Sequence, residues 1–225
     1  SPKRLPVVWL ELQDCAGCSE AFLRSSSPTA AELVLDILSV DYHETIMAPS
    51  GFNAEKSKED SIKAGGYVLV VEGSISTAGV GEYCTIAGKS SRAILEEAAH
   101  NAVAVIAVGN CATLGGIPAA NPNPTGAVGV WNIIKDKPVV NIPGCPMNPS
   151  NLTATVVHFL TYGSLPEMDQ MNRPLFAFGR RIHDNCERRG HFDAGEFVME
   201  WGDEGHRNGW CLYKMGCKGP TTFHN

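Results

Sequence analysis

The sequence predicts an α/β fold, in which a doubly wound parallel sheet over residues 1–165 is followed by an irregular segment over residues 166–225. Three observations support this prediction. Five short apolar runs rich in β-branched residues occur in the first part, helical patterns separate them, and aliphatic residues become scarce after Pro166. Such runs are typical of strands buried on both faces, and strands that alternate with helices form parallel sheets.

The predicted strands and helices alternate along the first part of the chain. One helix is predicted from about residue 90 to residue 102, because Ile94 and Leu95 fall on one side of it. A second is predicted from about Ser150 to Gly163, since glycine is typical of helix ends. The five strands are predicted at residues 7–10, 33–38, 67–71, 103–108 and 138–142.

The segment after Pro166 lacks the apolar residues that a core requires. Its sixty residues contain four Val, Ile or Leu residues, seventeen charged residues and eight glycines, so apolar burial alone cannot organise it. It nevertheless contains three cysteines and four histidines, which are metal-ligating residue types. We therefore expect bound metal to stabilise this segment.

The composition excludes several classes of function. The formal net charge is −6 and no stripe of Lys and Arg occurs, so no nucleic-acid partner is predicted. No apolar run approaches the roughly 20 residues of a membrane-spanning helix, and no signal-peptide pattern is visible, although a cleaved one would leave no trace. Nucleotide-binding and hydrolase motifs are missing, and no pair of carboxylates stands out as acid and base, so no catalytic residue is predicted.

Eight cysteines are the most informative feature of the sequence. Disulfide frameworks serve small secreted domains that lack a core, so metal ligation is favoured here. Four cysteines follow predicted strands: Cys15 and Cys18 the first, Cys111 the fourth and Cys145 the fifth. Because the carboxyl ends of parallel strands meet at one edge of a sheet, these four thiols are expected to converge there.

Three interpretations of these four thiols compete. Ligand count is compatible with either tetrahedral zinc or an iron–sulfur cluster. Structural zinc usually joins local loops through paired C-x-x-C motifs, whereas here one pair and two isolated cysteines come from distant loops, which favours a cluster. A thioredoxin-like redox pair at Cys15 and Cys18, with the other two as buried thiols, is disfavoured because such a pair needs no further cysteine on the same edge.

A second set of potential ligands lies in the segment without a core. Histidine can replace cysteine at an iron of a cluster. Taken alone, the histidine of this set would be interpreted as a solvated loop residue, but its H-x-x-C spacing favours a ligand. The set is His183, Cys186, Cys211 and Cys217. Cys84 has no potential ligand at suitable spacing and is predicted to be structural.

These motifs resemble those of the small, electron-transfer subunit of nickel–iron uptake hydrogenases. The resemblance covers essentially the whole chain and is specific in its details. The segments that establish it are CAGCSE at residues 15–20, DYHET at 41–45, GNCATLGG at 109–116, PGCP at 143–146, RGHFDAGEF at 189–197, and GCKGP at 216–220.

The resemblance implies a flavodoxin-like first domain that binds a proximal [4Fe–4S] cluster through Cys15, Cys18, Cys111 and Cys145. It implies a distal [4Fe–4S] cluster on His183, Cys186, Cys211 and Cys217 in an irregular iron–sulfur-binding C-terminal domain. Both ligand sets agree with the groupings made from the residues.

The resemblance also implies partners and a location. The family's large subunit holds the nickel–iron site that splits hydrogen (H2 = 2 H+ + 2 e−). The small subunit would relay electrons between that site and an external carrier, such as a cytochrome, near the distal cluster. The implied location is the periplasmic side of the bacterial inner membrane, in association with that membrane, after removal of a signal peptide.

The sequence departs from the family pattern at three places. A medial [3Fe–4S] cluster has its three cysteines beyond the position of Asn225, so it is expected only if the chain continues. Oxygen-tolerant members have two additional cysteines around the proximal cluster, at positions that match Gly17 and Gly116. Many members have threonine, whose hydroxyl is sometimes placed in the proton route, where this chain has Ala16.

Two alternative functions are compatible with parts of the pattern. The cluster-bearing quinone-reductase subunit of respiratory complex I, with its membrane-hydrogenase relatives, belongs to the same superfamily but lacks the second, His-containing segment. A zinc-stabilised interaction protein would use the same number of ligands without a redox role. Such a protein would be colourless, whereas a cluster protein would be brown and contain iron and labile sulfide.

Overall fold

The structure is a computed structural model and describes residues 4–224. It divides into two compact units, Ser1–Arg173 and Pro174–Asn225. The predicted boundary was residue 165, and the turn-forming residues 166–173 fall within the first unit. They do so because Asn141 binds them: its backbone amide donates to the Asn172 carbonyl at 2.8 Å, and its Nδ2 donates to the Met171 carbonyl at 2.8 Å.

The first unit is built on a five-stranded parallel sheet, as the sequence predicts. The strands are β1 (Leu5–Glu11), β2 (Leu38–His43), β3 (Val68–Glu72), β6 (Ala104–Val108) and β7 (Val139–Ile142). Their order is β2-β1-β3-β6-β7, which is the flavodoxin-like order. The chain changes direction across the sheet between β1 and β3, and ligands of such folds bind at the carboxyl ends of the strands at this point.

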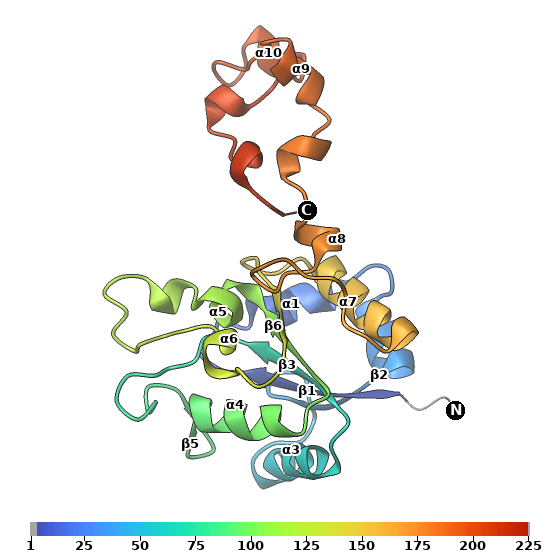
Figure 1. Cartoon of the computed structure of the whole chain (residues 1–225), viewed down its shortest axis with the longest axis vertical. Helices are drawn as coiled ribbons and strands as arrows, with labels where there is room; N and C mark the ends of the chain where they lie inside the picture. Colours follow the sequence, from blue (N-terminus) through green and yellow to red (C-terminus); the bar gives the residue numbers. More distant parts are fainter. Residues whose placement is uncertain (1–3, 225) are drawn as a thin grey trace. The chain divides into compact units, whose positions relative to one another are not determined.

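Helices cover both faces of the sheet. In Figure 1, α3 and α4 lie on one side of it, and α1 and α7 lie on the other. None of the helices within residues 4–224 is both long and apolar enough to cross a membrane. The bounds are α1 (Gly17–Leu23), α3 (Phe52–Ala64), α4 (Ser91–His100), α5 (Gly109–Leu114), α6 (Val130–Ile133), and α7 (Pro149–Tyr162), with a 3-10 turn η2 (Ile117–Ala119) and a small hairpin of β4 (Thr85–Ile86) and β5 (Lys89–Ser90).

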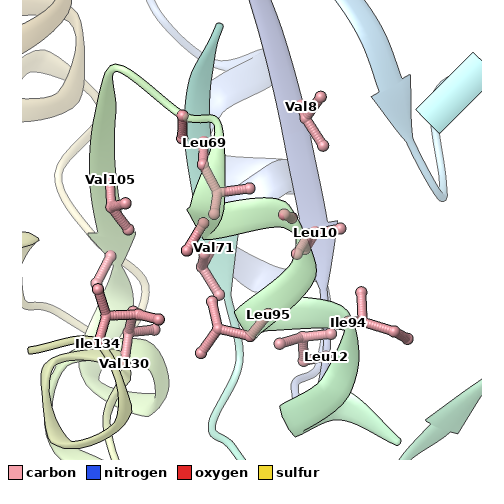
Figure 2. Packing of buried hydrophobic residues seen from close by; sticks show 14 of the residues in the cluster. Val8, Leu10, Leu12, Leu69, Val71, Ile94, Leu95, Val105, Val130 and Ile134 are labelled. Atoms are coloured by element: carbon pink, nitrogen blue, oxygen red, sulfur yellow. The ribbon is translucent and has the colours of Figure 1, made fainter. Parts of the chain in front are cut away.

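Alternate residues of the central strands pack against opposite helix layers. Figure 2 shows Leu10 of β1 in one cluster with Ile94 and Leu95 of α4. Trp9, the preceding residue of β1, lies on the other face, where it lines an apolar cavity with Leu152 of α7. Burying a Leu or Ile side chain contributes about 1.5–3 kcal/mol to the stability of the fold, so the helix layers on both faces stabilise the sheet.

The predicted strand at residues 33–38 is wrong, whereas the other four are confirmed. The chain is helical there, as α2 (Ala30–Glu32) and a π-helical turn (Leu33–Ile37), and β2 starts at Leu38. A capping box starts this helix: the Thr29 side chain accepts from the Glu32 amide, and the Glu32 carboxylate accepts from the Thr29 amide. Since β2 is an edge strand paired only with β1, it is less continuously apolar than the central strands.

The second unit consists of short helices joined by loops. Its buried apolar residues among those that the structure describes are Ala177, Phe178, Val198 and Cys211. So small a core agrees with the scarcity of aliphatic residues in the sequence. The elements are α8 (Leu175–Phe178), η3 (Ile182–Asn185), α9 (Arg189–Asp193), α10 (Glu204–Arg207), η4 (Tyr213–Met215) and η5 (Gly219–Thr221).

Candidate functional site

Four cysteines line one cavity at the carboxyl edge of the first unit's sheet, as their positions after strands predict. Cys15 and Cys18 follow β1, Cys111 lies in α5 directly after β6, and Cys145 follows β7. The cavity has a volume of about 80 Å³. One water needs about 10–15 Å³ on the same measure, so the four residues surround space for a body of several atoms.

The ligand residues of the second unit surround a second cavity. It is lined by the four predicted ligands His183, Cys186, Cys211 and Cys217, and has a volume of about 170 Å³. The His183 and Phe192 rings pack in a T-shaped arrangement, with 4.5 Å between the ring centroids. The Gly219 amide donates to the Cys217 sulfur at 3.3 Å, which is the kind of hydrogen bond that tunes a cluster.

The spacing of these ligands favours a cluster over a single zinc ion. Zn–S bonds of about 2.3 Å place the sulfurs of a tetrahedral site about 3.8 Å apart. Within residues 4–224, the only three ligand atoms of His, Cys, Asp or Glu that all lie within 4.8 Å of one another belong to Glu11, Asp14 and Glu72. The ligands around each cavity are therefore spread more widely than one zinc ion requires, as they would be around an iron–sulfur cube.

Two glycines bring backbone against the sulfurs of the first cavity. A Cβ on Gly109 would overlap the Sγ of Cys18, and a Cβ on Gly116 would lie 2.5 Å from the Sγ of Cys111. Both glycines also have positive φ, +82° and +59°, which side-chain-bearing residues rarely adopt. Because these two residues have no side chains, the space beside the sulfurs stays free for a bulky group.

Burial makes two thiols of the first cavity, those of Cys18 and Cys111, poor acids on their own. It raises the pKa of Cys18 to about 12 and also raises the pKa of Cys111. Metal binding requires the thiolate, so the positive charge of bound iron would have to offset this cost of burial. Ligation and loss of the thiol protons are therefore coupled at this site.

A network of carboxylates beside the first cavity was missed by the sequence analysis. Glu11 and Glu72 end the paired strands β1 and β3, are opposite each other in register, and are both buried. Asp14 lies with them, and burial together with the Glu72 charge raises its pKa to about 7. The missed signal was a glutamate at the end of an otherwise apolar strand, where two neighbouring strands place their last residues side by side.

These carboxylates do not form an open metal site. Glu72 accepts hydrogen bonds on both oxygens, from the backbone amides of Cys18 and Ser19, the Ser19 hydroxyl and the Trp9 indole. One donor therefore binds Oε1 and three crowd Oε2. His43, which contacts the Ser19 hydroxyl, has a pKa lowered to about 4 by burial and is neutral near pH 7.

Cys84 is not among the residues that line the two cavities. It packs half-buried against the core cluster of the first unit. Burial raises the pKa of its thiol, which keeps it protonated. This position is the one expected of a structural cysteine.

A flavodoxin-like sheet with a four-thiol cavity, followed in the chain by a second cavity of three thiols and one imidazole, defines an α/β protein with two candidate sites for iron–sulfur clusters. Two family models divide the chain between them. The model described as NADH ubiquinone oxidoreductase, 20 Kd subunit, matches residues 15–159. The model for the C-terminal part of the NiFe/NiFeSe hydrogenase small subunit matches residues 178–225.

Relatives match along the whole chain. The Hydrogenase-2 small chain of Escherichia coli is 51% identical over all of this chain, and the quinone-reactive Ni/Fe-hydrogenase small chain of Wolinella succinogenes is 50% identical over 99% of it. The chain spans 61% and 64% of the lengths of these two relatives. The chain belongs to the nickel–iron hydrogenase small-subunit family.

A solved structure agrees with this assignment. The [NiFeSe] hydrogenase structure from Desulfovibrio vulgaris Hildenborough matches with a TM-score of 0.91 and 37% identity, covering all of this chain and 86% of that one. The match to the hydrogenase C-terminal model in the second unit excludes the complex I alternative, which lacks such a segment.

Proposed function

We propose that the chain relays electrons between the nickel–iron site of a hydrogenase large subunit and an external carrier. The observation that supports this most directly is the pair of four-ligand cavities, whose ligands are too widely spaced for single zinc ions. In this proposal, Cys15, Cys18, Cys111 and Cys145 hold a proximal [4Fe–4S] cluster. A distal [4Fe–4S] cluster is held by His183, Cys186, Cys211 and Cys217.

The protein's own residues fix how these clusters would be held. A bound cluster supplies reversible one-electron redox chemistry. The strand ends and α5 orient the four thiols of the first cavity, and the glycines beside them allow close approach of the backbone. At the second cavity, His183 is half-exposed, so this ligand offers electrons an exit toward solvent and a carrier.

Two parts of the proposal rest on the family alone. A medial [3Fe–4S] cluster is expected if the chain continues past residue 225. The periplasmic side of the inner membrane is the proposed location, with a cytochrome as one candidate carrier.

Iron, sulfide and spectroscopy test the proposal. The purified complex with its large subunit should contain iron and labile sulfide and show EPR signals of reduced [4Fe–4S] centres. Hydrogen oxidation with a viologen acceptor should be measurable. A colourless protein that contains zinc in place of iron would contradict the proposal and support the interaction-protein alternative.

Removing the metal should unfold the second unit selectively. Because its core contains four buried apolar residues among those described, we expect residues 174–224 to exchange their amide hydrogens rapidly in the iron-free chain. The strands β3 and β6, buried along their whole length, should stay protected and provide the internal control. Hydrogen exchange with and without iron measures this, and equal protection of residues 174–224 in both states would contradict it.

Replacing His183 should impair electron exit. We expect His183→Ala to slow hydrogen oxidation with an external acceptor by about 10–100-fold, because it removes a ligand of the exit cluster. Hydrogen–deuterium exchange at the large subunit should change much less. His183→Cys should retain iron but lower the cluster potential, since imidazole ligands raise it.

A histidine in the same unit supplies the control for His183. His206 is exposed in α10 and does not line the second cavity. His206→Ala should therefore leave electron exit unchanged. An unchanged acceptor rate in His183→Ala would show that His183 is not a ligand.

A further inference from the structure

Glu72 is a buried carboxylate that lines the first cavity without being one of its proposed ligands. It is the last residue of β3 and is 2% exposed. The chain after β1 passes over the Glu72 side chain, so that Cys18 and Ser19, in the first turn of α1, lie against its two carboxylate oxygens. This position couples a strand of the sheet to the segment that contains two of the four thiols.

The carboxylate of Glu72 caps the first turn of α1. It accepts from the Cys18 amide at 2.8 Å and from the Ser19 amide at 2.9 Å. A capping side chain normally comes from the residue before the helix, but that residue is Ala16, which makes no side-chain cap and has a φ of +57°. Glu72 therefore takes the place of the missing local cap from 54 residues away along the chain.

The carboxylate of Glu72 is surrounded by hydrogen-bond donors. Each of its described hydrogen-bond partners is a donor, including the Ser19 hydroxyl at 2.6 Å and the Trp9 indole at 3.3 Å. Within residues 4–224, no Lys, Arg or His forms an ion pair with it. A carboxylate at this position therefore has hydrogen bonds but no cation beside it, and its nearest charged neighbours are the acidic side chains of Glu11 and Asp14.

A fixed negative charge beside a cluster favours the more oxidised state of that cluster. Charge, hydrogen bonds and burial around a cluster set its reduction potential, and the low dielectric of a buried site strengthens the effect of a charge. The backbone amides that Glu72 binds are also kept from the sulfurs of the cavity. Both effects act in the same direction, toward a lower potential.

We propose that Glu72 positions Cys18 and lowers the reduction potential of the cluster bound in the first cavity. The inference rests on the proposed function, because it requires that a cluster is bound there. A lower proximal potential makes the reduced cluster a stronger electron donor to the next centre and a weaker acceptor from the large subunit. Glu72 is thus a positioning residue, which acts on the cluster through Cys18 and through its charge.

Two variants of the complete hydrogenase complex separate the two roles. Glu72→Gln removes the charge and leaves one acceptor oxygen for two amides, whereas Glu72→Asp keeps the charge but withdraws it from α1. The proximal midpoint potential, from redox titration followed by EPR, should shift upward in Glu72→Gln and upward by less in Glu72→Asp. The iron content of the proximal site should fall in both. Glu96→Gln, which breaks an exposed ion pair with Arg92 on α4, is the matched control and should shift neither quantity.

Each result decides one part of the inference. An unchanged or lower proximal potential in Glu72→Gln overturns the charge role. An upward shift in Glu72→Asp that equals or exceeds the shift in Glu72→Gln overturns it as well. If Glu72→Gln holds no proximal cluster, positioning is supported, and the charge role depends on Glu72→Asp, where an unchanged or lower potential overturns it. Full iron content in both variants overturns the positioning role. Wild-type protein without a proximal EPR signal would instead contradict the proposed function itself.

Discussion

Gly109→Ala is expected to abolish the proximal cluster while the distal cluster stays bound. The added Cβ would overlap the Sγ of Cys18, and the backbone at this residue has a φ of +82°. Because Gly109 lies between β6 and the proposed ligand Cys111, the chain cannot move Gly109 without moving Cys111. Hydrogen oxidation should fall by about 10–100-fold or more, and the proximal EPR signal should disappear.

Gly163→Ala is the matched control for Gly109→Ala. Gly163 ends α7 with a φ of +65°, and a Cβ there would meet nothing within 4 Å. Its replacement should cost about 1–2 kcal/mol of stability, from the left-handed backbone alone. Both clusters should remain. Retention of the proximal signal in Gly109→Ala would show that the cavity adapts more readily than its geometry indicates.

The grouping of the cysteines could be predicted from the sequence because topology alone determines it. Cys111 and Cys145 are distant along the chain, yet each directly follows a strand of a parallel sheet, and the structure brings both to the cavity of Cys15 and Cys18. The rule needs no knowledge of side-chain packing. The second set was predictable for another reason, since a segment without a core had few residues other than metal ligands to organise it.

The role of Glu72 could not be predicted from the sequence. The predicted third strand ended at residue 71, so this glutamate was placed outside the sheet. Its function depends on the register between β1 and β3, which sets Glu72 opposite Glu11. It depends equally on the left-handed conformation of Ala16, which leaves the first turn of α1 without a local cap. Neither property follows from periodicity or composition.

The wrong strand at residues 33–38 has a related cause. A short apolar run does not distinguish a buried strand from a helix packed on one side. Here the run is helical, with Leu33 buried and Leu35 68% exposed. The decisive signal was local: Thr29 and Glu32 form a capping box just before the run.

The enzyme is expected to be oxygen-sensitive, and the reason lies at two glycines of the first cavity. A Cβ on Gly17 would lie 3.2 Å from the Sγ of Cys15, and one on Gly116 would lie 2.5 Å from the Sγ of Cys111. Both positions therefore adjoin the sulfurs of proposed ligands, where additional thiolates would reach a bound cluster. Oxygen-tolerant family members have such cysteines at the matching positions, and this chain has none.

Without those thiolates, the proximal centre should deliver only one electron. Four cysteine ligands support a conventional [4Fe–4S] centre that cycles between two charge states, whereas additional thiolates would donate charge to the irons and stabilise a further oxidised state. A second electron would then be available when oxygen attacks the nickel–iron site. Cys84 is no substitute, since it does not line the cavity. The backbone at Gly116, with φ +59° and ψ −148°, is one that glycine alone adopts readily, so a cysteine there would require a different loop.

Redox titration followed by EPR should therefore show one proximal transition and no superoxidised signal. Hydrogen oxidation should stop under air and recover only after reduction, because the proximal cluster cannot promptly supply the second electron needed to reduce oxygen bound at the nickel–iron site. The distal cluster serves as the internal control, since its transition should be the same before and after exposure. Sustained turnover in air, or a second proximal transition, would show that the geometry at Gly17 and Gly116 does not determine oxygen sensitivity. Replacement of Cys84 would then show whether movement of its loop supplies the missing thiolate.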